Sequence, residues 1–495
     1  MILGVSAGFH DASITLLNRR GNIVFAGHSE RYSKIKNDPN ISREMLDEIL
    51  GYNIDTVSYY ETPWKKQIRG LISGEGLEFD KLTTRQIIKH QLGSNVDILG
   101  KKVLSFNHHL SHAAAGFQTS SFDRATVVVI DAIGEFDTIS IWGAEYNHMG
   151  HAKYKLLWRQ KYPNSIGLFY SAMTVRIGLK PMEEEYILMG MSAYGSRKYG
   201  YGNKLKSLLI DNEWDVTFKE NLHAGVDQNF WSSLHDADIA ASTQEVAENL
   251  IYNVIRRAKN FNWSNNLVYM GGVALNCLAN RNLGDYFENI WIMPNPGDAG
   301  SSLGAAALAY GRAVTWNNAF LGHNIDGNYP VNELLDHLLK DKIVGVASGR
   351  AEFGPRALGN RSLLADPRGN DIKEKVNVIK RRQQFRPFAP VILEEVAHHY
   401  FDFNTGWNNS RYMQSVADCK YPDRYPAICH VDGTSRVQTV PKDGSGIREL
   451  LEKWYVLTDC PMLLNTSLNI RGEPMVNDRN DADRFEQLYG IKVCS

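Results

Sequence analysis

Two histidines four residues apart, His108 and His112, stand in the segment NHHLSHAAAG and could bind one metal ion. On a helix this spacing places both imidazoles on the same face. Further along the chain, Asp131 ends a predicted buried strand, and Asp298 lies in PNPGDAGSSLG, where a helix is predicted to begin. Two imidazoles and two carboxylates suit Fe²⁺, Mn²⁺ or Zn²⁺. Two surface histidines with two helix-capping aspartates are the alternative, and the adjacent His109 leaves the choice of ligand open.

The segment Arg350–Arg386 is rich in positive charge. It holds ten basic and four acidic residues, a local balance of +6, and glycines and prolines interrupt it. This pattern is unlike a smooth charged helix or a disordered basic tail. Because arginine binds phosphate and carboxylate oxygens through two parallel hydrogen bonds, the segment predicts a pocket for small anions that carry several charges. A solvated surface of salt bridges is the alternative, and an RNA-binding patch is disfavoured by the balanced charge of the whole chain.

Two later strings are dense in hydrogen-bonding side chains. Residues 430–438, HVDGTSRVQ, alternate polar and small residues as a strand would, which predicts several polar groups on one face. Asn465, Ser467 and Asn469 follow the apolar run Met462–Leu464. Amides and hydroxyls at the end of a strand offer hydrogen bonds to an uncharged NH₂–C=O group. A turn with capping residues is the alternative.

Glycines cluster at three predicted loops: at Gly134, at Gly271 and Gly272, and between Gly297 and Gly304. Glycine lets backbone N–H groups approach a phosphate, and the N-terminus of a helix adds a favourable dipole. Tight turns after strands explain each cluster equally well.

A strand, a polar loop and a hairpin occur twice in the same order in the N-terminal third. The predicted strands are Ile2–Ala7, Ser13–Leu17 and Ile23–His28 in the first copy, and Thr126–Asp131, Thr138–Glu145 and Tyr154–Arg159 in the second. Their apolar patterns are typical of strands. The repeat predicts a duplicated α/β core whose loops face each other across a cleft, as in the actin-like and sugar-kinase ATPases. Two unrelated hairpins are the alternative.

The clearest predicted helix covers residues 242–262, where Ser242 and Glu245 form a capping box and apolar residues recur at helical spacing. A βαβ-like unit follows it. The polar stretch Asn317–Tyr329 predicts a domain boundary, and a second α/β segment begins at Ile343.

The 495 residues allow two to four domains with large cores. Lys and Arg number 54 against 55 Asp and Glu, which excludes a wholly basic protein that coats nucleic acid. No apolar stretch approaches the roughly 18–20 residues that span a bilayer, and the first residues lack the basic region of a signal peptide. The five cysteines are scattered and form no CxxC pair, which fits a reducing compartment. We therefore expect a soluble cytoplasmic protein without a membrane partner.

The sequence resembles the O-carbamoyltransferases of the NodU/CmcH family over nearly the whole chain. The strings that carry the resemblance are SAGFHDAS, ERYSKIK, HHLSHAAAG, VVVIDAIGEFDT, MGMSAYG, GGVALNCLAN, GDAGSSLGAA, GRAEFGPRALGNRS, FRPFAP, HVDGTSRVQTV and LLNTSLNIRGEP. Any one of them could arise by chance, whereas eleven in family order are highly specific.

The resemblance implies an actin-like (ASKHA-type) carbamoyl-transfer domain at residues 1–325 and a YrdC-like α/β domain at residues 326–495. The second domain would form carbamoyl adenylate from carbamoyl phosphate and ATP, with Mg²⁺. The first would pass the carbamoyl group to an acceptor hydroxyl. Activation as a mixed anhydride is needed because a carbamoyl carbon is a poor electrophile, and a metal ion would stabilise the charge that develops during transfer.

The resemblance also assigns individual residues. Those that would bind ATP and carbamoyl phosphate are Arg350, Arg356, Arg361, Lys380, Arg382, Arg436, Asn465, Ser467 and Asn469. The metal ligands would be His108, His112, Asp131 and Asp298, with iron as the family precedent. His10 would act as general base, with a structural histidine as the alternative, and Lys36 would contact the substrate. The loops at the adenylate phosphate would contain Gly134, Gly271, Gly272, Asn276 and Gly297. One departure is Gln383, where family members usually carry Glu.

Three functions from different classes remain open at this point. The resemblance favours transfer to a hydroxyl of a small molecule, such as an antibiotic or sugar alcohol or a hydroxymethylated pyrimidine nucleotide. A threonylcarbamoyl-type enzyme that modifies tRNA is the second, although the balanced charge disfavours a large nucleic-acid footprint. The third is an actin-like nucleotide switch without enzymatic activity, which leaves the basic segment without a role. A homodimer is left open.

Overall fold

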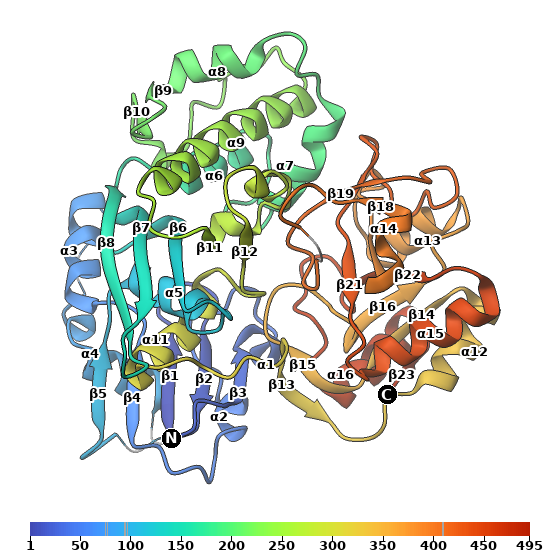
Figure 1. Ribbon diagram of the computed structural model, residues 1–495, viewed down its shortest axis with the longest axis horizontal. Coiled ribbons are helices and arrows are strands. Elements are labelled where there is room, and N and C mark those ends of the chain that lie inside the picture. The colour runs from blue at the N-terminus through green and yellow to red at the C-terminus, as the bar shows by residue number, and fades with distance from the viewer. Residues whose placement is uncertain (75, 77, 94–95, 97, 408–409) are drawn as a thin grey trace. The chain divides into compact units, whose positions relative to one another are not determined.

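The computed structural model describes residues 1–74, 76, 78–93, 96, 98–407 and 410–495 (Figure 1). Its contacts divide the chain into two compact units. The first comprises Met1–Ser33, Asn37–Ala279 and Leu283–Asn317, and the second comprises Lys34–Lys36, Asn280–Asn282 and Asn318–Ser495. The assignment of separate functions to residues 1–325 and 326–495 stays a prediction.

The first unit contains a five-stranded mixed sheet in the order β3-β2-β1-β4-β5. Its strands are β1 (Ile2–Ser6), β2 (Ser13–Leu17), β3 (Ile23–His28), β4 (Thr56–Tyr59) and β5 (Lys102–Ser105). The strand β1 pairs antiparallel with β2, with Val5 opposite Ile14, and parallel with β4. The strands β2 and β3 are antiparallel, and β4 and β5 are parallel.

A second five-stranded sheet in this unit repeats that topology in the order β12-β11-β6-β7-β8. Its strands are β6 (Arg124–Gly134), β7 (Asp137–Tyr146), β8 (Ala152–Lys161), β11 (Asn266–Met270) and β12 (Asn289–Trp291). The strand β6 pairs antiparallel with β7 and parallel with β11, β7 pairs antiparallel with β8, and β11 pairs parallel with β12. The predicted duplicated α/β core is confirmed, and its strand order is that of the actin-like class.

Helices connect and cover these two sheets. They are α1 (Glu30–Ser33), α2 (Arg43–Asp47), α3 (Pro63–Ser73), α4 (Thr84–Leu92), α5 (His108–Phe117), α6 (Ile166–Arg176), α7 (Glu185–Met191), α8 (Tyr201–Leu209), α9 (Asp236–Asn260), α10 (Cys277–Asn280) and α11 (Ser301–Tyr310). A short hairpin joins β9 (Ile210–Asn212) to β10 (Thr217–Phe218).

The helix α9 starts earlier than the sequence predicts. It begins at Asp236, after the N-cap residue His235, whose side chain accepts a hydrogen bond from the Ala237 N–H. Ser242 is buried inside the helix, where its hydroxyl donates to the Asp238 carbonyl. The predicted capping box was therefore wrong, because serine also bonds back to the preceding turn within a helix.

The helix α11 is rich in small residues because it packs closely on two neighbours, β1 and α5. A Cβ atom on Gly4 of β1 would lie 1.9 Å from the Ser302 carbonyl oxygen, and a Cβ atom on Gly304 would lie 1.8 Å from the Ser111 carbonyl oxygen of α5. Only glycine fits at these two contacts. This close packing brings the N-terminal ends of α5 and α11 near each other.

The second unit is built on a six-stranded mixed sheet in the order β21-β17-β22-β16-β14-β23. Its strands are β14 (Ile343–Ala347), β16 (Arg361–Ala365), β17 (Ala389–Leu393), β21 (Gln438–Val440), β22 (Met462–Ser467) and β23 (Val493–Cys494). A smaller sheet contains β18 (Phe401–Asp402), β19 (Ala417–Cys419) and β20 (Thr434–Ser435), and β13 (Phe320–Ile325) pairs with β15 (Gly349–Glu352).

The helices that the structure describes in this unit are α12 (Val331–Asp341), α13 (Ile372–Ile379), α14 (Ala397–Tyr400), α15 (Gly446–Thr458) and α16 (Arg479–Tyr489). The apolar faces of α12 and α15 pack with Val344, Leu364 and Leu463 of the sheet in one core cluster. The α/β class predicted for this unit is confirmed.

The predicted strand over residues 430–438 is wrong for most of its length. Residues 430–433 form a turn in which the His430 N–H donates to the Thr434 carbonyl, and Gly433 has a φ of 81°. Only Thr434, Ser435 and Gln438 lie in strands. The Asp-Gly pair breaks the alternating pattern, as such pairs commonly do in turns.

Among the described residues, no helix combines the length and the apolar character needed to cross a bilayer.

Candidate functional site

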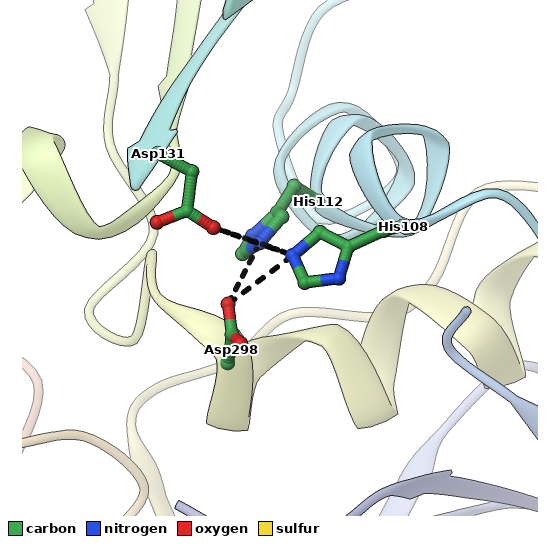
Figure 2. Close-up of side chains that lie close together, drawn as sticks. All are labelled: His108, His112, Asp131 and Asp298. Atoms are coloured by element: carbon green, nitrogen blue, oxygen red, sulfur yellow. Dashed lines mark hydrogen bonds and ion pairs between the residues drawn. The ribbon is translucent and has the colours of Figure 1, made fainter. Parts of the chain in front are cut away.

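Three neighbouring elements of the first unit place four side chains around one point (Figure 2). His108 and His112 lie one turn apart on α5, whose N-cap residue Asn107 accepts a hydrogen bond from the Leu110 N–H. Asp131 lies near the end of β6, and Asp298 begins the 3₁₀ turn η6 (Asp298–Gly300) that leads into α11. We call these four residues the ligand cluster.

The ligand atoms of the cluster have the spacing of a metal site. His108 Nε2 and His112 Nε2 lie 3.1 Å apart, and each lies 3.2–3.3 Å from Asp131 Oδ2 and Asp298 Oδ1. All four atoms lie within 4.8 Å of one another. Ligands about 2.0 Å from a tetrahedral ion are about 3.3 Å apart. Five of the six separations therefore match those around a divalent first-row ion, and the sixth, between the two carboxylate oxygens, is at most 4.8 Å.

Backbone hydrogen bonds orient the Asp131 carboxylate. Its Oδ1 accepts from the N–H of Ala132 at 2.8 Å and of Gly272 at 3.3 Å, which leaves Oδ2 facing the two histidines. His112 is fixed through its other nitrogen, since Nδ1 lies 3.0 Å from the Pro296 carbonyl oxygen and donates to it. These contacts present one oxygen and one nitrogen to the centre of the cluster.

Strong charge coupling acts within the buried cluster. Burial lowers the pKa of His108, but the charge of Asp298 and the hydrogen bonds to both aspartates outweigh it and hold this pKa well above its usual value. The pKa of His112 is raised against burial by the same carboxylates. Burial raises the pKa of Asp131, but its hydrogen bonds to the histidines keep this pKa well below its usual value. Burial also raises the pKa of Asp298, but the charge of His108 and hydrogen bonds to both histidines hold this pKa well below its usual value. Both carboxylates thus stay ionised, as metal ligands must be.

The third histidine of the motif, His109, does not belong to the cluster. Its Nδ1 lies 2.8 Å from the hydroxyl of Ser140 on β7, and this hydroxyl also accepts from Trp142 Nε1. Burial and the nearby His108 hold the pKa of His109 well below its usual value. His109 is therefore a neutral core histidine, and the choice of ligand that the sequence left open is resolved.

His10 lies next to the cluster in the loop after β1. Its Nε2 is 3.6 Å from Asp298 Oδ2, and its Nδ1 is 3.1 Å from Asp11 Oδ2. Burial lowers the pKa of His10, but Asp11 and Asp298 outweigh it and raise the pKa to about 9. Without a bound cation, His10 is protonated near neutral pH. Lys36, which the resemblance assigns to a substrate contact, is counted with the second unit.

The glycines predicted at phosphate loops surround the cluster, and two of them have steric reasons to be glycine. A Cβ atom on Gly134 would lie 2.5 Å from His108 Cδ2, and one on Gly271, where φ is 92°, would lie 2.2 Å from the Ile130 carbonyl oxygen. Gly272 donates to Asp131 Oδ1, and Gly297 directly precedes Asp298. These roles do not exclude a phosphate contact, which stays a prediction.

Asn276, predicted to lie at the adenylate phosphate, has hydrogen-bond partners within the protein. Its side-chain amide exchanges two hydrogen bonds with Gln244 of α9 and accepts a third from the Ala279 N–H. These contacts connect two elements of the first unit, so Asn276 already has a structural role.

In the second unit, Arg361 differs from the other predicted phosphate-binding residues. Its side chain is fully buried, and its guanidinium donates to five backbone carbonyls, those of His323, Ser348, Gly349, Asn360 and Asn477. A phosphate could be bound only by breaking these bonds. We therefore remove Arg361 from the predicted anion site and assign it to the scaffold of this unit.

Lys380, Ser467 and Asn469 are brought together as predicted. Lys380 Nζ is almost fully buried and donates to the carbonyl of each of the other two residues, to Ser467 Oγ at 3.2 Å and to Asn469 Oδ1 at 2.9 Å. Burial and the charges of Arg382 and Arg386 hold the pKa of Lys380 well below its usual value. This lysine orders the loop that follows β22.

The remaining predicted residues lie on neighbouring elements of the same unit. Asn465 Nδ2 donates to the Ala357 carbonyl and to Gln438 Oε1, while its buried Oδ1 has no hydrogen-bond partner among the described residues. Arg382 lies over the Phe388 ring and donates to Asn377 and Pro387. Arg350 donates to the carbonyls of Leu321 and Gly322, whereas Arg356 and Arg436 are partly exposed.

Two buried glutamates escaped the sequence analysis. Glu61 carries its carboxylate between Lys66 and His108. Burial raises the pKa of Glu61, but the charge of Lys66 and the nearby His108 outweigh burial and hold this pKa below its usual value. Glu352 Oε1 accepts from the N–H groups of Leu358, Asn360 and Arg361, so it fixes the loop of the GPRALGN string. An acidic residue inside an apolar or glycine-rich stretch was the available signal for both.

Two family models match this chain. One is described as carbamoyltransferase N-terminus and matches residues 64–307, and the other is described as carbamoyltransferase C-terminus and matches residues 335–493. The first contains the whole ligand cluster, and the second contains Lys380 and the loop after β22.

Several proteins resemble the chain along most of its length. An uncharacterized protein from Synechocystis is 32% identical over 98% of this chain and 93% of its own. Nodulation protein NolO from Bradyrhizobium diazoefficiens is 32% identical over 76% of this chain and 75% of its own, and nodulation protein NolNO from Sinorhizobium fredii is 28% identical over 96% and 76%.

Solved structures with some likeness include the activator of 2-hydroxyisocaproyl-CoA dehydratase from Clostridium difficile and full-length HypF. Their TM-scores are 0.36 and 0.35 at 14% and 13% identity, and each covers 62% of this chain, with 94% and 55% of their own chains covered. The actin-like fold of the first unit is shown by the repeated strand order of its two five-stranded sheets.

Proposed function

The chain belongs to the carbamoyltransferase family and is a carbamoyltransferase, and from this premise we propose that it is an ATP-dependent O-carbamoyltransferase with two chemical steps. The family models carry the proposal, and the ligand cluster and the Lys380 loop supply a candidate site for each step. The acceptor is a hydroxyl of a small molecule, of the antibiotic, sugar or hydroxymethylated pyrimidine nucleotide type.

The first step belongs to the second unit. Carbamoyl phosphate, ATP and water give carbamoyl adenylate, pyrophosphate and phosphate, with Mg²⁺ accompanying the ATP. Arg350, Arg356, Arg382 and Arg436 are the proposed anion-binding residues. Lys380, Ser467 and Asn469 hold the loop after β22, and the unpartnered Oδ1 of Asn465 suits the NH₂ group of the carbamoyl moiety.

The second step belongs to the first unit, where the acceptor hydroxyl attacks the carbamoyl carbon and AMP leaves. The ligand cluster would hold Fe²⁺, Mn²⁺ or Zn²⁺, which would stabilise negative charge on the oxygen or phosphate of the reacting adenylate. Support for the fit comes from the spacing of the four ligand atoms, which are His108 Nε2, His112 Nε2 and one oxygen of each aspartate.

His10 is the proposed general base for the acceptor hydroxyl. His10 can take up the proton only as neutral imidazole. When no cation offsets the negative charges of Asp11 and Asp298, His10 is mostly protonated. A cation held by Asp298 would offset that negative charge and favour neutral His10. Lys36 is proposed to contact the substrate, and Gly134, Gly271, Gly272 and Gly297 to contact the adenylate phosphate.

Five free cysteines support a reducing, cytoplasmic location.

Exchange of pyrophosphate into ATP that depends on carbamoyl phosphate tests the first step without any acceptor. We expect exchange in the wild type and its loss in Lys380→Ala. The matched control is Lys375→Ala, which removes an exposed lysine paired with Asp371 and should leave exchange intact. Absence of exchange in folded, metal-loaded wild type would overturn the adenylation step.

The second step is tested by supplying candidate alcohols and following the mass gain of one carbamoyl group. We expect Asp298→Asn to abolish this gain while pyrophosphate exchange continues, because Asp298 lies in the first unit and the proposed adenylation site lies in the second. Full transfer by Asp298→Asn would contradict a role for the cluster.

A further inference from the structure

Glu61 is a buried acid that the proposed chemistry leaves without a role. It follows β4 by two residues, and its side chain is 3% exposed. Its Oε1 lies 2.8 Å from Lys66 Nζ, and its Oε2 lies 3.6 Å from His108 Nδ1. Keeping a carboxylate buried is costly unless it is paired. The lysine supplies one partner, and the imidazole faces its second oxygen.

The two nitrogens of His108 face opposite surroundings. Nε2 points into the ligand cluster, whereas the buried Nδ1 has no hydrogen-bond partner within normal distance among the described residues. A histidine that binds a cation through Nε2 carries its proton on Nδ1, and that proton needs an acceptor. Glu61 Oε2 is the carboxylate oxygen facing this position, close enough to become the acceptor after a shift of a few tenths of an ångström.

His112 offers a comparison within the same helix. Its Nδ1 lies 3.0 Å from the Pro296 carbonyl, so its proton goes to a neutral backbone group. The corresponding acceptor for His108 is charged. A carboxylate behind a ligand histidine fixes the proton on Nδ1 and makes Nε2 a stronger donor to the metal.

We propose that Glu61 is a positioning residue that accepts the Nδ1 proton of His108, and that Lys66 moderates its charge. This inference rests on the metal site of the proposed function. Lys66 competes with His108 for the Glu61 carboxylate and also lies over the Phe9 ring, 5.0 Å from its centre. Phe9 in turn contacts His10, so a continuous series of contacts runs from the ligand His108 to the proposed general base His10.

Binding of Co²⁺ alone to the metal-free full-length protein tests the inference without any turnover. The dissociation constant is measured by competition with a chromogenic chelator, and the visible spectrum of bound Co²⁺ reports its coordination. We expect Glu61→Gln to raise the dissociation constant about 10–100-fold, the usual effect of losing such a partner. An increase of less than threefold would overturn the proposal.

A matched control separates this role from general damage. Glu135 is also buried and pairs with a lysine, Lys65 at 3.4 Å, but its other partners are Thr62 and Asn107 and not a ligand histidine. Glu135→Gln should keep the dissociation constant within threefold of the wild type. Equal weakening in both variants would show that a buried charge, and not the contact to His108, is responsible.

Lys66→Met gives a readout of opposite sign and serves if Glu61→Gln fails to fold. Without the lysine, the whole Glu61 charge acts on His108, so Co²⁺ should bind several-fold more tightly. Weaker binding in Lys66→Met would contradict the proposal. If the wild type itself binds no Co²⁺, the metal site of the proposed function is wrong. If the wild type binds Co²⁺ and both the Glu61→Gln and Lys66→Met variants bind it equally well, only the proposed role of Glu61 is wrong.

Discussion

The protonation of His10 depends on two carboxylates, so this residue gives the site a measurable pH dependence. Its folded-state pKa of about 9 lies above the unfolded value of about 6.5, because Asp11 and Asp298 outweigh burial. Protonation of His10 therefore stabilises the fold fully below pH 6.5, and this contribution is lost as the pH rises to 9. Relative to His10→Gln, metal-free wild type should lose up to about 3 kcal/mol of unfolding free energy over that range.

Urea denaturation at pH 6, 7.5 and 9 in the presence of a chelator measures this difference. A constant gap between the two proteins would show that the carboxylates do not act on His10. With a cation bound, the gap should shrink, since the cation offsets the charge of Asp298.

Single residues also show where reading the sequence succeeds and where it stops. His108 and His112 could be predicted as a pair, because helical spacing alone puts them on one face. Arg361 was predicted to bind phosphate because the amino-acid sequence does not show where its guanidinium points. In the structure that guanidinium donates to five backbone carbonyls. Glu61 escaped notice because its partner His108 is 47 residues away in the chain.

At the scale of elements, the packing of α11 against α5 sets the distance between Asp298 and the two histidines. A Cβ atom on Gly304 would lie 1.8 Å from the Ser111 carbonyl, so Gly304→Ala must push the helices apart. We expect a loss of about 1–3 kcal/mol of stability, as for other overpacked sites, and weaker Co²⁺ binding. The control is Gly190→Ala in α7, where nothing lies within 4 Å of the added Cβ.

The control has an expected sign of its own. Alanine inside a helix is favoured over glycine by about 0.5–1 kcal/mol, so Gly190→Ala should be neutral or stabilising and should leave metal binding unchanged. Thermal denaturation and Co²⁺ titration of both variants measure the two effects. Intact metal binding in a folded Gly304→Ala protein would mean that the helix contact does not position the cluster.

Elements were more predictable than their ends. The repeated strand pattern identified both halves of the duplicated core, because buried strands have strong apolar signatures. The start of α9 was placed six residues too late, since Ser242 satisfies its hydroxyl inside the helix as readily as at a cap. The turn at 430–433 was missed because polar alternation also occurs in loops held by Asp-Gly pairs.

For the whole molecule, the proposed function assigns one chemical step to each of the two compact units. All four cluster ligands come from the first unit, whereas Lys380 and the loop after β22 belong to the second. A ligand that binds only the folded form stabilises it, by about 2.7 kcal/mol when its concentration is 100 times the dissociation constant. Co²⁺ should therefore raise the unfolding temperature of the first unit selectively.

Differential scanning calorimetry with and without Co²⁺, combined with hydrogen exchange, can assign the effect to one unit. We expect greater protection of α5, β6 and α11 when the metal is bound, and unchanged protection of β16 and β22. Chelation should reverse the effect. Asp298→Asn should show none of it, because removing one carboxylate charge leaves both histidines with a single anionic partner for the cation. Protection that rises equally in both units would contradict a metal site confined to the first, and the two proposed steps would then no longer map onto separate units.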